Sequence, residues 1–162
     1  MRRVCLHTEF TSLNRYTCKL ISLALVVPGG PEFYVELIDA WEEGDCSDFV
    51  REIVLPQLVL ATYGRTTEQA RIDLLGFLQK LGPVEIISDA PDWDWPLLVW
   101  LAGLGGLPEG VEAGTISGDN EVAAEGEGAA PPCSPGCPDA GSIGGAIQPR
   151  MTISHVRNIT SL

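Results

Sequence analysis

Two residues near the start of the chain, His7 and Glu9, have the spacing needed to act together. They flank Thr8 within a short, mostly apolar run at residues 4–10, and this composition predicts a β-strand. Side chains two positions apart on a strand point to the same face, so we expect the imidazole and the carboxylate to lie side by side. The plainer interpretation is that Glu9 is an ordinary carboxylate at the edge of a sheet.

Asp92 and Asp94 are two further acidic residues, and they stand between a predicted strand and a predicted helix. They follow a brief apolar run at residues 84–88, which predicts a buried strand. They also lead into an apolar stretch at residues 93–104, which predicts a helix. Acidic side chains in the first turn of a helix are stabilised by the helix dipole, so their presence is also explained without any chemistry.

The elements that must position these residues alternate between strands and helices, an order that predicts an α/β domain. Residues 28–31, Pro-Gly-Gly-Pro, predict the turn of a hairpin between two strands. Pro56 is expected to end or kink the first helix, and Gly82 is expected to end the second. Strands are predicted at residues 4–10, 19–27, 32–38 and 84–88, and helices at residues 46–60, 66–81 and 93–104.

The composition favours an acidic, soluble protein with reduced thiols. Its longest apolar runs fall well short of the roughly 20 residues that span a bilayer, and its charged start lacks the core of a signal peptide, so we expect no membrane contact and a cytoplasmic location. Cys133 and Cys137 are spaced too widely for a CxxC motif, and no second pair completes a zinc site. The net charge of −12 disfavours tight, nonspecific binding to long nucleic acids.

The ordered pattern is expected to end at Leu104. Residues 105–145 are rich in Gly, Ala, Pro and Glu and hold few large apolar side chains, so they cannot bury enough surface to offset the entropy of ordering. Residues 146–162 regain apolar side chains that could add a short strand. The predicted organisation is a domain over residues 1–104 followed by a disordered, low-complexity acidic tail over residues 105–162.

Two segments carry a resemblance to a known family. Residues 6–13, which contain His7 and Glu9, together with residues 20–24, resemble the first two strands of small bacterial 3′–5′ exoribonuclease-like proteins. These belong to the DEDD-type exonucleases and usually read Asp-Thr-Glu-Phe where this chain reads His-Thr-Glu-Phe. The resemblance covers residues 4–104.

The second segment, residues 88–98, resembles the family's second motif, an acidic residue after an aromatic one that leads into an apolar helix. Asp94 fits the register of this motif better than Asp92. The family has an RNase H-like fold, so the resemblance implies a mixed sheet whose first three strands are antiparallel, flanked by helices.

The resemblance implies a hydrolase that acts on the 3′ end of single-stranded RNA or DNA, with two Mg²⁺ or Mn²⁺ ions held in part by Glu9 and Asp94. His7 stands where the family has its first metal-binding aspartate, and a neutral imidazole has little affinity for Mg²⁺. In the DEDDh subgroup a histidine acts as general base and precedes a last aspartate by five positions. His155 could be that base, but Thr160 stands in the place of the aspartate. His155 is equally well explained as an exposed histidine of the tail.

We therefore expect a 3′–5′ exonuclease-like protein with impaired catalysis. Glu9, Asp94 and His155 are the candidate catalytic residues, and His7, Glu9 and Asp94 are the candidate metal ligands, which are expected to converge at one cleft. One alternative is a non-catalytic protein that keeps the fold to bind a partner or a nucleotide. Another is an exonuclease whose C-terminal part is truncated or frame-altered, because the composition changes abruptly after Leu104. RNA and DNA both remain as substrates, and the sequence predicts no oligomeric state.

Overall fold

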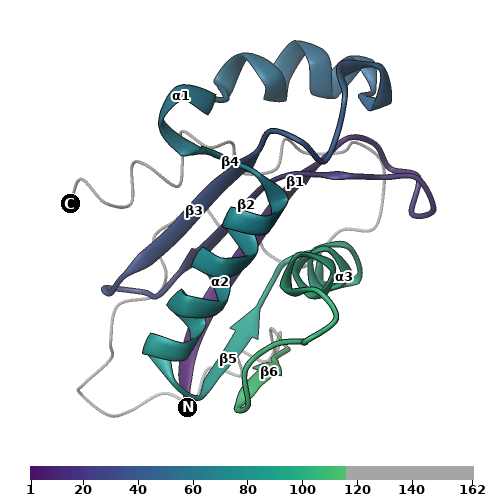
Figure 1. Ribbon diagram of the computed structural model, residues 1–162. Helices are drawn as coiled ribbons and strands as arrows, with labels where there is room; N and C mark the ends of the chain where they lie inside the picture. The colour runs from purple at the N-terminus through teal and green to yellow at the C-terminus, as the bar shows by residue number, and fades with distance from the viewer. Residues whose placement is uncertain (116–162) are drawn as a thin grey trace.

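The computed structural model describes residues 1–115, which form a mixed sheet with two helices packed against one face (Figure 1). The six strands lie in the order β4-β3-β2-β1-β5-β6. They are β1 (Arg2–Phe10), β2 (Leu20–Val26), β3 (Glu32–Leu37), β4 (Gly64–Arg65), β5 (Val84–Ile87) and β6 (Val111–Ala113).

The first three strands form an antiparallel meander, as the sequence predicted. β1 pairs with β2, and β2 pairs with β3, both in antiparallel orientation. The turn between β2 and β3 uses Gly29 at a φ of 67°, a left-handed conformation that glycine adopts without steric cost. β5 then pairs parallel to β1 on its other side, so β1 is the strand through which the two halves of the sheet are joined.

The α/β architecture is completed by helices α2 (Thr67–Leu81) and α3 (Pro91–Ala102), which pack together in one apolar core with the sheet. α2 begins where the sequence predicted, because the side chain of Thr66 accepts from the backbone of Gln69 and the Gln69 side chain accepts from the backbone of Thr66. α3 begins two residues earlier than the predicted Trp93 and accommodates Pro96 within its span.

The helix predicted at residues 46–60 is not continuous. In its place are a 3-10 turn η1 (Glu43–Asp45), a π-helical turn η2 (Val50–Val54), a 3-10 turn η3 (Leu55–Gln57) and a short helix α1 (Leu60–Tyr63). Pro56 has no N–H to donate, and the chain is extended at Leu58. The apolar spacing still serves packing, since Val50 and Val54 are buried against Ile21 and Cys46 in a second, smaller core.

The ordered domain extends past Leu104, where we expected it to end. β6 pairs parallel with β5, with Val111 opposite Val84 and Ala113 opposite Ile86. The connection from α3 turns at Gly103, Gly106 and Gly110, all at positive φ. Glycines that the composition associates with disorder therefore shape the return to the sheet. His155, the two cysteines at 133 and 137, and residues 146–162 lie outside the described residues.

Within residues 1–115, no helix is both long enough and apolar enough to cross a membrane.

The packing of α2 can be tested with two substitutions on opposite faces of the same helix. Leu74 is fully buried in the core, whereas Ile72 is 64% exposed. Leu74→Ala removes buried methyl groups and leaves a cavity, so we expect it to lower the free energy of unfolding by about 2–5 kcal/mol. Ile72→Ala should change it by no more than about 0.5 kcal/mol. Urea unfolding of both variants provides the measurement, and equal losses would contradict this orientation of α2.

Candidate functional site

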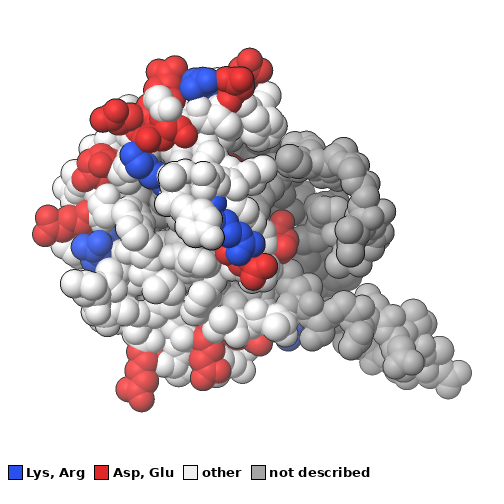
Figure 2. Space-filling view, turned by 90° about the vertical axis from the view of Figure 1, so that its right-hand side faces the viewer, with Lys and Arg blue, Asp and Glu red and all other residues white. Residues whose placement is uncertain are grey.

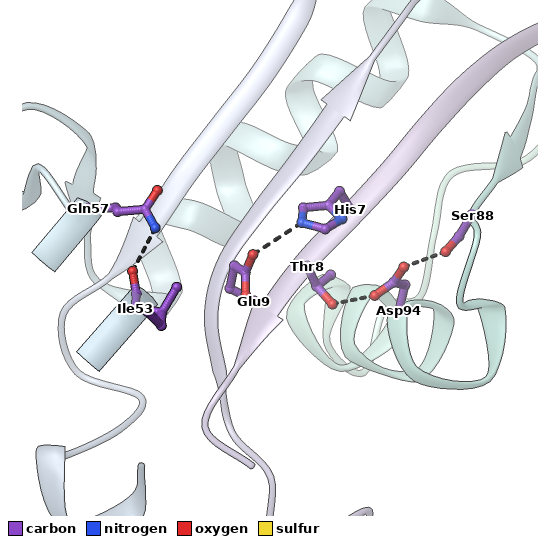
Figure 3. A network of polar contacts seen from close by, with 7 residues as sticks. All are labelled: His7, Thr8, Glu9, Ile53, Gln57, Ser88 and Asp94. Atoms are coloured by element: carbon purple, nitrogen blue, oxygen red, sulfur yellow. Dashed lines mark hydrogen bonds and ion pairs between the residues drawn. The ribbon is translucent and has the colours of Figure 1, made fainter. Parts of the chain in front are cut away.

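His7 and Glu9 lie side by side on β1, the central strand of the antiparallel and parallel pairings. Their side chains point to the same face, and Nε2 of His7 is 3.2 Å from Oε1 of Glu9 (Figure 3). The two side chains are only 19% and 11% exposed. The spacing in the sequence therefore led to a real contact between an imidazole and a carboxylate in a recessed position.

Small side chains on the neighbouring strand leave room for this pair. The register sets Ala24 of β2 opposite His7 and Ser22 of β2 opposite Glu9, and both of these small residues are buried. A large side chain at either position would compete with the pair for the same face of the sheet. The recess at His7 and Glu9 is thus partly a consequence of the composition of β2.

Glu36 is a second carboxylate on this face, and it has a structural role. It is fully buried on β3, in register with Ser22. Its carboxylate accepts hydrogen bonds from the Tyr34 hydroxyl at 2.8 Å and from the backbone N–H of Val59, whose nitrogen lies 3.0 and 2.8 Å from the two oxygens. Glu36 therefore fixes the start of α1 to the sheet. Sequence reasoning missed it, although a glutamate inside an apolar strand was a visible signal.

The electrostatic environment of His7 favours its protonated form. Burial by itself would lower the pKa of the imidazole, but the hydrogen bond to Glu9 and the negative charge of that carboxylate act in the opposite direction. The charges of Asp94 and Asp89 add to this effect, and together they raise the pKa of His7 above its usual value of 6.5. An imidazolium at this position neutralises part of the surrounding negative charge.

Asp94 lies in the first turn of α3 and is fully buried. Its Oδ1 accepts a hydrogen bond of 2.5 Å from the hydroxyl of Thr8, and its Oδ2 accepts one from the hydroxyl of Ser88 (Figure 3). Thr8 lies between His7 and Glu9 on the strand, so its side chain points to the opposite face. The structure thus joins Asp94 to the middle residue of the triplet, while His7 and Glu9 form their own pair.

Asp92 and Asp89, by contrast, are exposed. The side chain of Asp92 is 81% exposed and lies 3.7 Å from the guanidinium of Arg15. Asp89 follows the end of β5, the strand that pairs with β1, and its charge acts on His7. Sequence reasoning used Asp89 only as a boundary of the strand. Its position directly after a strand parallel to β1 was the signal that could have placed it near the triplet.

The geometry of these residues does not fit a two-metal centre. Mg²⁺ prefers several oxygen ligands, whereas His7 presents a nitrogen that is hydrogen bonded to Glu9. Both oxygens of Asp94 already accept hydrogen bonds from hydroxyls. Among residues 1–115, no three or more His, Cys, Asp and Glu side chains are grouped so that they could hold a metal ion.

Comparisons with known proteins identify no family for this chain. No protein-family model matches it, and no curated protein has a significant sequence match to it.

The pairing of His7 with Glu9 predicts a pH dependence of stability. The pKa of His7 is higher in the folded protein than in the unfolded chain, so protonation contributes stability that is complete below about pH 6.5. This contribution is lost as the pH rises through the raised pKa of the folded state. We therefore expect the stability of the wild type, relative to His7→Asn, to fall as the pH rises above about 6.5 in urea titrations with EDTA.

Glu9→Gln serves as the control for the pH experiment. It keeps the size of the side chain and removes the charge that contributes most to raising the pKa of His7. The pH dependence assigned to His7 should therefore shrink in this background. Curves for the wild type and His7→Asn that stay parallel over the whole range would contradict the role given to the pair.

The buried position of Asp94 predicts a large difference from its exposed neighbour Asp92. Asp94→Ala leaves the hydroxyls of Thr8 and Ser88 without their acceptor in a buried setting, so we expect a loss of about 1–3 kcal/mol in the free energy of unfolding. Asp92→Ala, in the same turn of α3, should change it by about 0.5 kcal/mol or less. Thermal and urea unfolding of the two variants would decide, and equal effects would refute the anchoring role of Asp94.

Proposed function

We propose that this chain is a 3′–5′ exonuclease-like protein with an RNase H-like domain, and that its catalysis is impaired. It is related in this proposal to metal-dependent phosphodiester hydrolases that act on the 3′ ends of single-stranded nucleic acid in the cytoplasm. The observation that carries the proposal is the position of the triplet His7-Thr8-Glu9. It lies on the central strand, and the helix that follows β5 is joined to it by the hydrogen bond from Thr8 to Asp94.

The arrangement of elements supports the relationship. An antiparallel β1-β2-β3 meander is followed by α2, by β5 beside β1, and by α3, which is the order that the family resemblance implies. Glu9 and Asp94 come from the two elements that carry the family's first two acidic motifs. Glu9 is part of the triplet on β1, and Asp94 accepts a hydrogen bond from the middle residue of that triplet, Thr8, on the opposite face of the sheet.

The impairment follows from the chemistry of the substituted residue. Two divalent cations can lie close together only where several carboxylates offset their mutual repulsion. His7 removes one carboxylate, and the imidazolium that its surroundings favour would repel a cation at the same place. The imidazolium and the carboxylates of the site therefore neutralise one another, and we derive no hydrolytic step from them.

The surface charge is consistent with binding to the end of a nucleic acid strand and not with binding along a long stretch of it. In Figure 2, Lys and Arg side chains are scattered and have Asp and Glu beside them, and no basic stripe crosses this face. Lys19 pairs with Asp45, for example, and Arg51 pairs with Asp48. Tight binding along a phosphate backbone needs many Lys and Arg side chains that have no acidic partner. The end of a nucleic acid strand therefore matches this surface better than a long stretch of the strand.

The same site favours a second candidate, a non-catalytic protein that keeps the fold to bind a nucleotide, a nucleic acid end or a partner. The specific observation is that the carboxylates are already occupied. Glu9 is paired with His7, and Asp94 accepts from Thr8 and Ser88. A site whose acids are internally satisfied can retain its shape without metal ions.

A nuclease assay separates active from impaired protein. We expect wild type and Glu9→Ala to leave a 3′-labelled single-stranded RNA intact in the presence of Mn²⁺. We expect His7→Asp to bind Mn²⁺ more tightly than wild type in calorimetric titrations, because it restores an oxygen ligand beside Glu9. It should nevertheless stay inactive, since a single restored acid does not complete a two-metal site.

Glu32→Ala, which removes an exposed glutamate at the start of β3, is the matched control for Glu9→Ala. Degradation by wild type and by Glu32→Ala, but not by Glu9→Ala, would show an active enzyme and would overturn the impairment. Failure of His7→Asp to gain any affinity for Mn²⁺ would count against the relationship to the metal-dependent hydrolases.

A further inference from the structure

Trp93, at the start of α3, lies between a buried and an exposed partner. The Phe10 ring stacks on it with a centroid distance of 5.2 Å and an interplanar angle of 6°. The guanidinium carbon of Arg15 lies 4.8 Å from the centroid of the Trp93 ring. Phe10 and Arg15 thus both stack on the Trp93 ring.

The outer end of this stack faces solvent. The Arg15 side chain is 57% exposed, and its ionic contact with Asp92 is long, at 3.7 Å. The next residue, Tyr16, is 98% exposed, the largest value of any aromatic side chain among residues 1–115. A planar cation and an exposed aromatic ring therefore belong to the same loop.

Hydrogen bonds hold this loop in place. Thr11 and Lys19 close its base, with the N–H of Thr11 donating to the carbonyl of Lys19 and the N–H of Lys19 donating to the hydroxyl of Thr11, each at 3.0 Å. Inside the loop, the side-chain oxygen of Asn14 accepts from the N–H of Tyr16 at 3.0 Å. The exposed groups are thus presented on an ordered turn, which reduces the entropy that binding would cost.

We propose that Arg15 and Tyr16 form a stacking platform for the nucleobases of a single-stranded nucleic acid, an inference that rests on the proposed function. Bases stack on aromatic rings and on guanidinium planes whatever their sequence, since every base has a π-face. The loop that contains Arg15 and Tyr16 begins directly after β1, the strand that carries His7 and Glu9.

The charge of the protein favours this mode of binding. A chain with a net charge of −12 gains little from contact with many phosphates, so its affinity for nucleic acid must come from contacts other than charge neutralisation. Stacking supplies such contacts and depends less on salt. Asp92, beside Arg15, would also repel a phosphate and leave the guanidinium plane as the attractive surface.

Binding in EDTA tests the platform apart from any cleavage. The probe is a short single-stranded RNA labelled with a fluorophore at its 5′ end, followed by fluorescence anisotropy. Removal of one stacking side chain weakens such binding by roughly 5-fold or more, so we expect losses of that size for Tyr16→Ala and for Arg15→Ala. Tyr16→Phe keeps the ring and should bind like wild type, whereas Arg15→Lys keeps the charge without the plane and should bind more weakly.

Arg65→Ala is the matched control, because Arg65 is also an exposed arginine with a long ionic contact, 3.9 Å from Asp73, and it lies at the β4 edge of the sheet. It should leave binding unchanged. If wild type binds the RNA and both alanine variants at the platform bind equally well, the platform is refuted while the proposed function stands. If wild type does not bind, the platform is also refuted, and the Mn²⁺ titration of His7→Asp still decides the proposed function separately.

Discussion

The arrangement of the site depends on the hydrogen bonds that the buried carboxylate of Asp94 accepts. Its two oxygens accept hydrogen bonds from Thr8 on β1 and from Ser88 after β5, so a single side chain joins the central strand, the end of its parallel neighbour and the first turn of α3. A buried carboxylate is costly unless such donors satisfy it. The position of α3 against the sheet is therefore constrained by the need to keep both hydroxyls within reach.

This constraint also determines what the other residues of the triplet can do. With Thr8 committed to Asp94 on the inner face, strand geometry directs His7 and Glu9 to the other face. Phe10, two residues after Thr8, lies on the same face as Thr8 and stacks on Trp93, which also contacts Arg15. The pair on one face and the platform beside it thus follow from one short stretch of β1.

Features that depend on nearby residues were predictable from the sequence, and features that depend on distant ones were not. The capping box of Thr66 and Gln69 lies within one turn, and α2 begins where that pattern predicted. The contact between His7 and Glu9 likewise follows from a spacing of two. The position of α1, in contrast, depends on Glu36, which accepts a hydrogen bond from the N–H of Val59, 23 residues away in the sequence. Thr8, whose hydroxyl donates a hydrogen bond to Asp94, is 86 positions away from Asp94 in the sequence.

His7 also contributes to the stability of the site through its charge. The negative charges of Glu9, Asp89 and Asp94 all act on the same imidazole, that of His7. In a metal-dependent relative the cations would offset their repulsion. Here the raised pKa of His7 places a positive charge among them, and the hydrogen bond to Glu9 fixes it there. The histidine thereby takes over the electrostatic part of a cation's role, while it offers no open coordination position for the activation of water. Under the proposed function, a histidine in place of the family's aspartate would account both for impaired catalysis and for a retained fold.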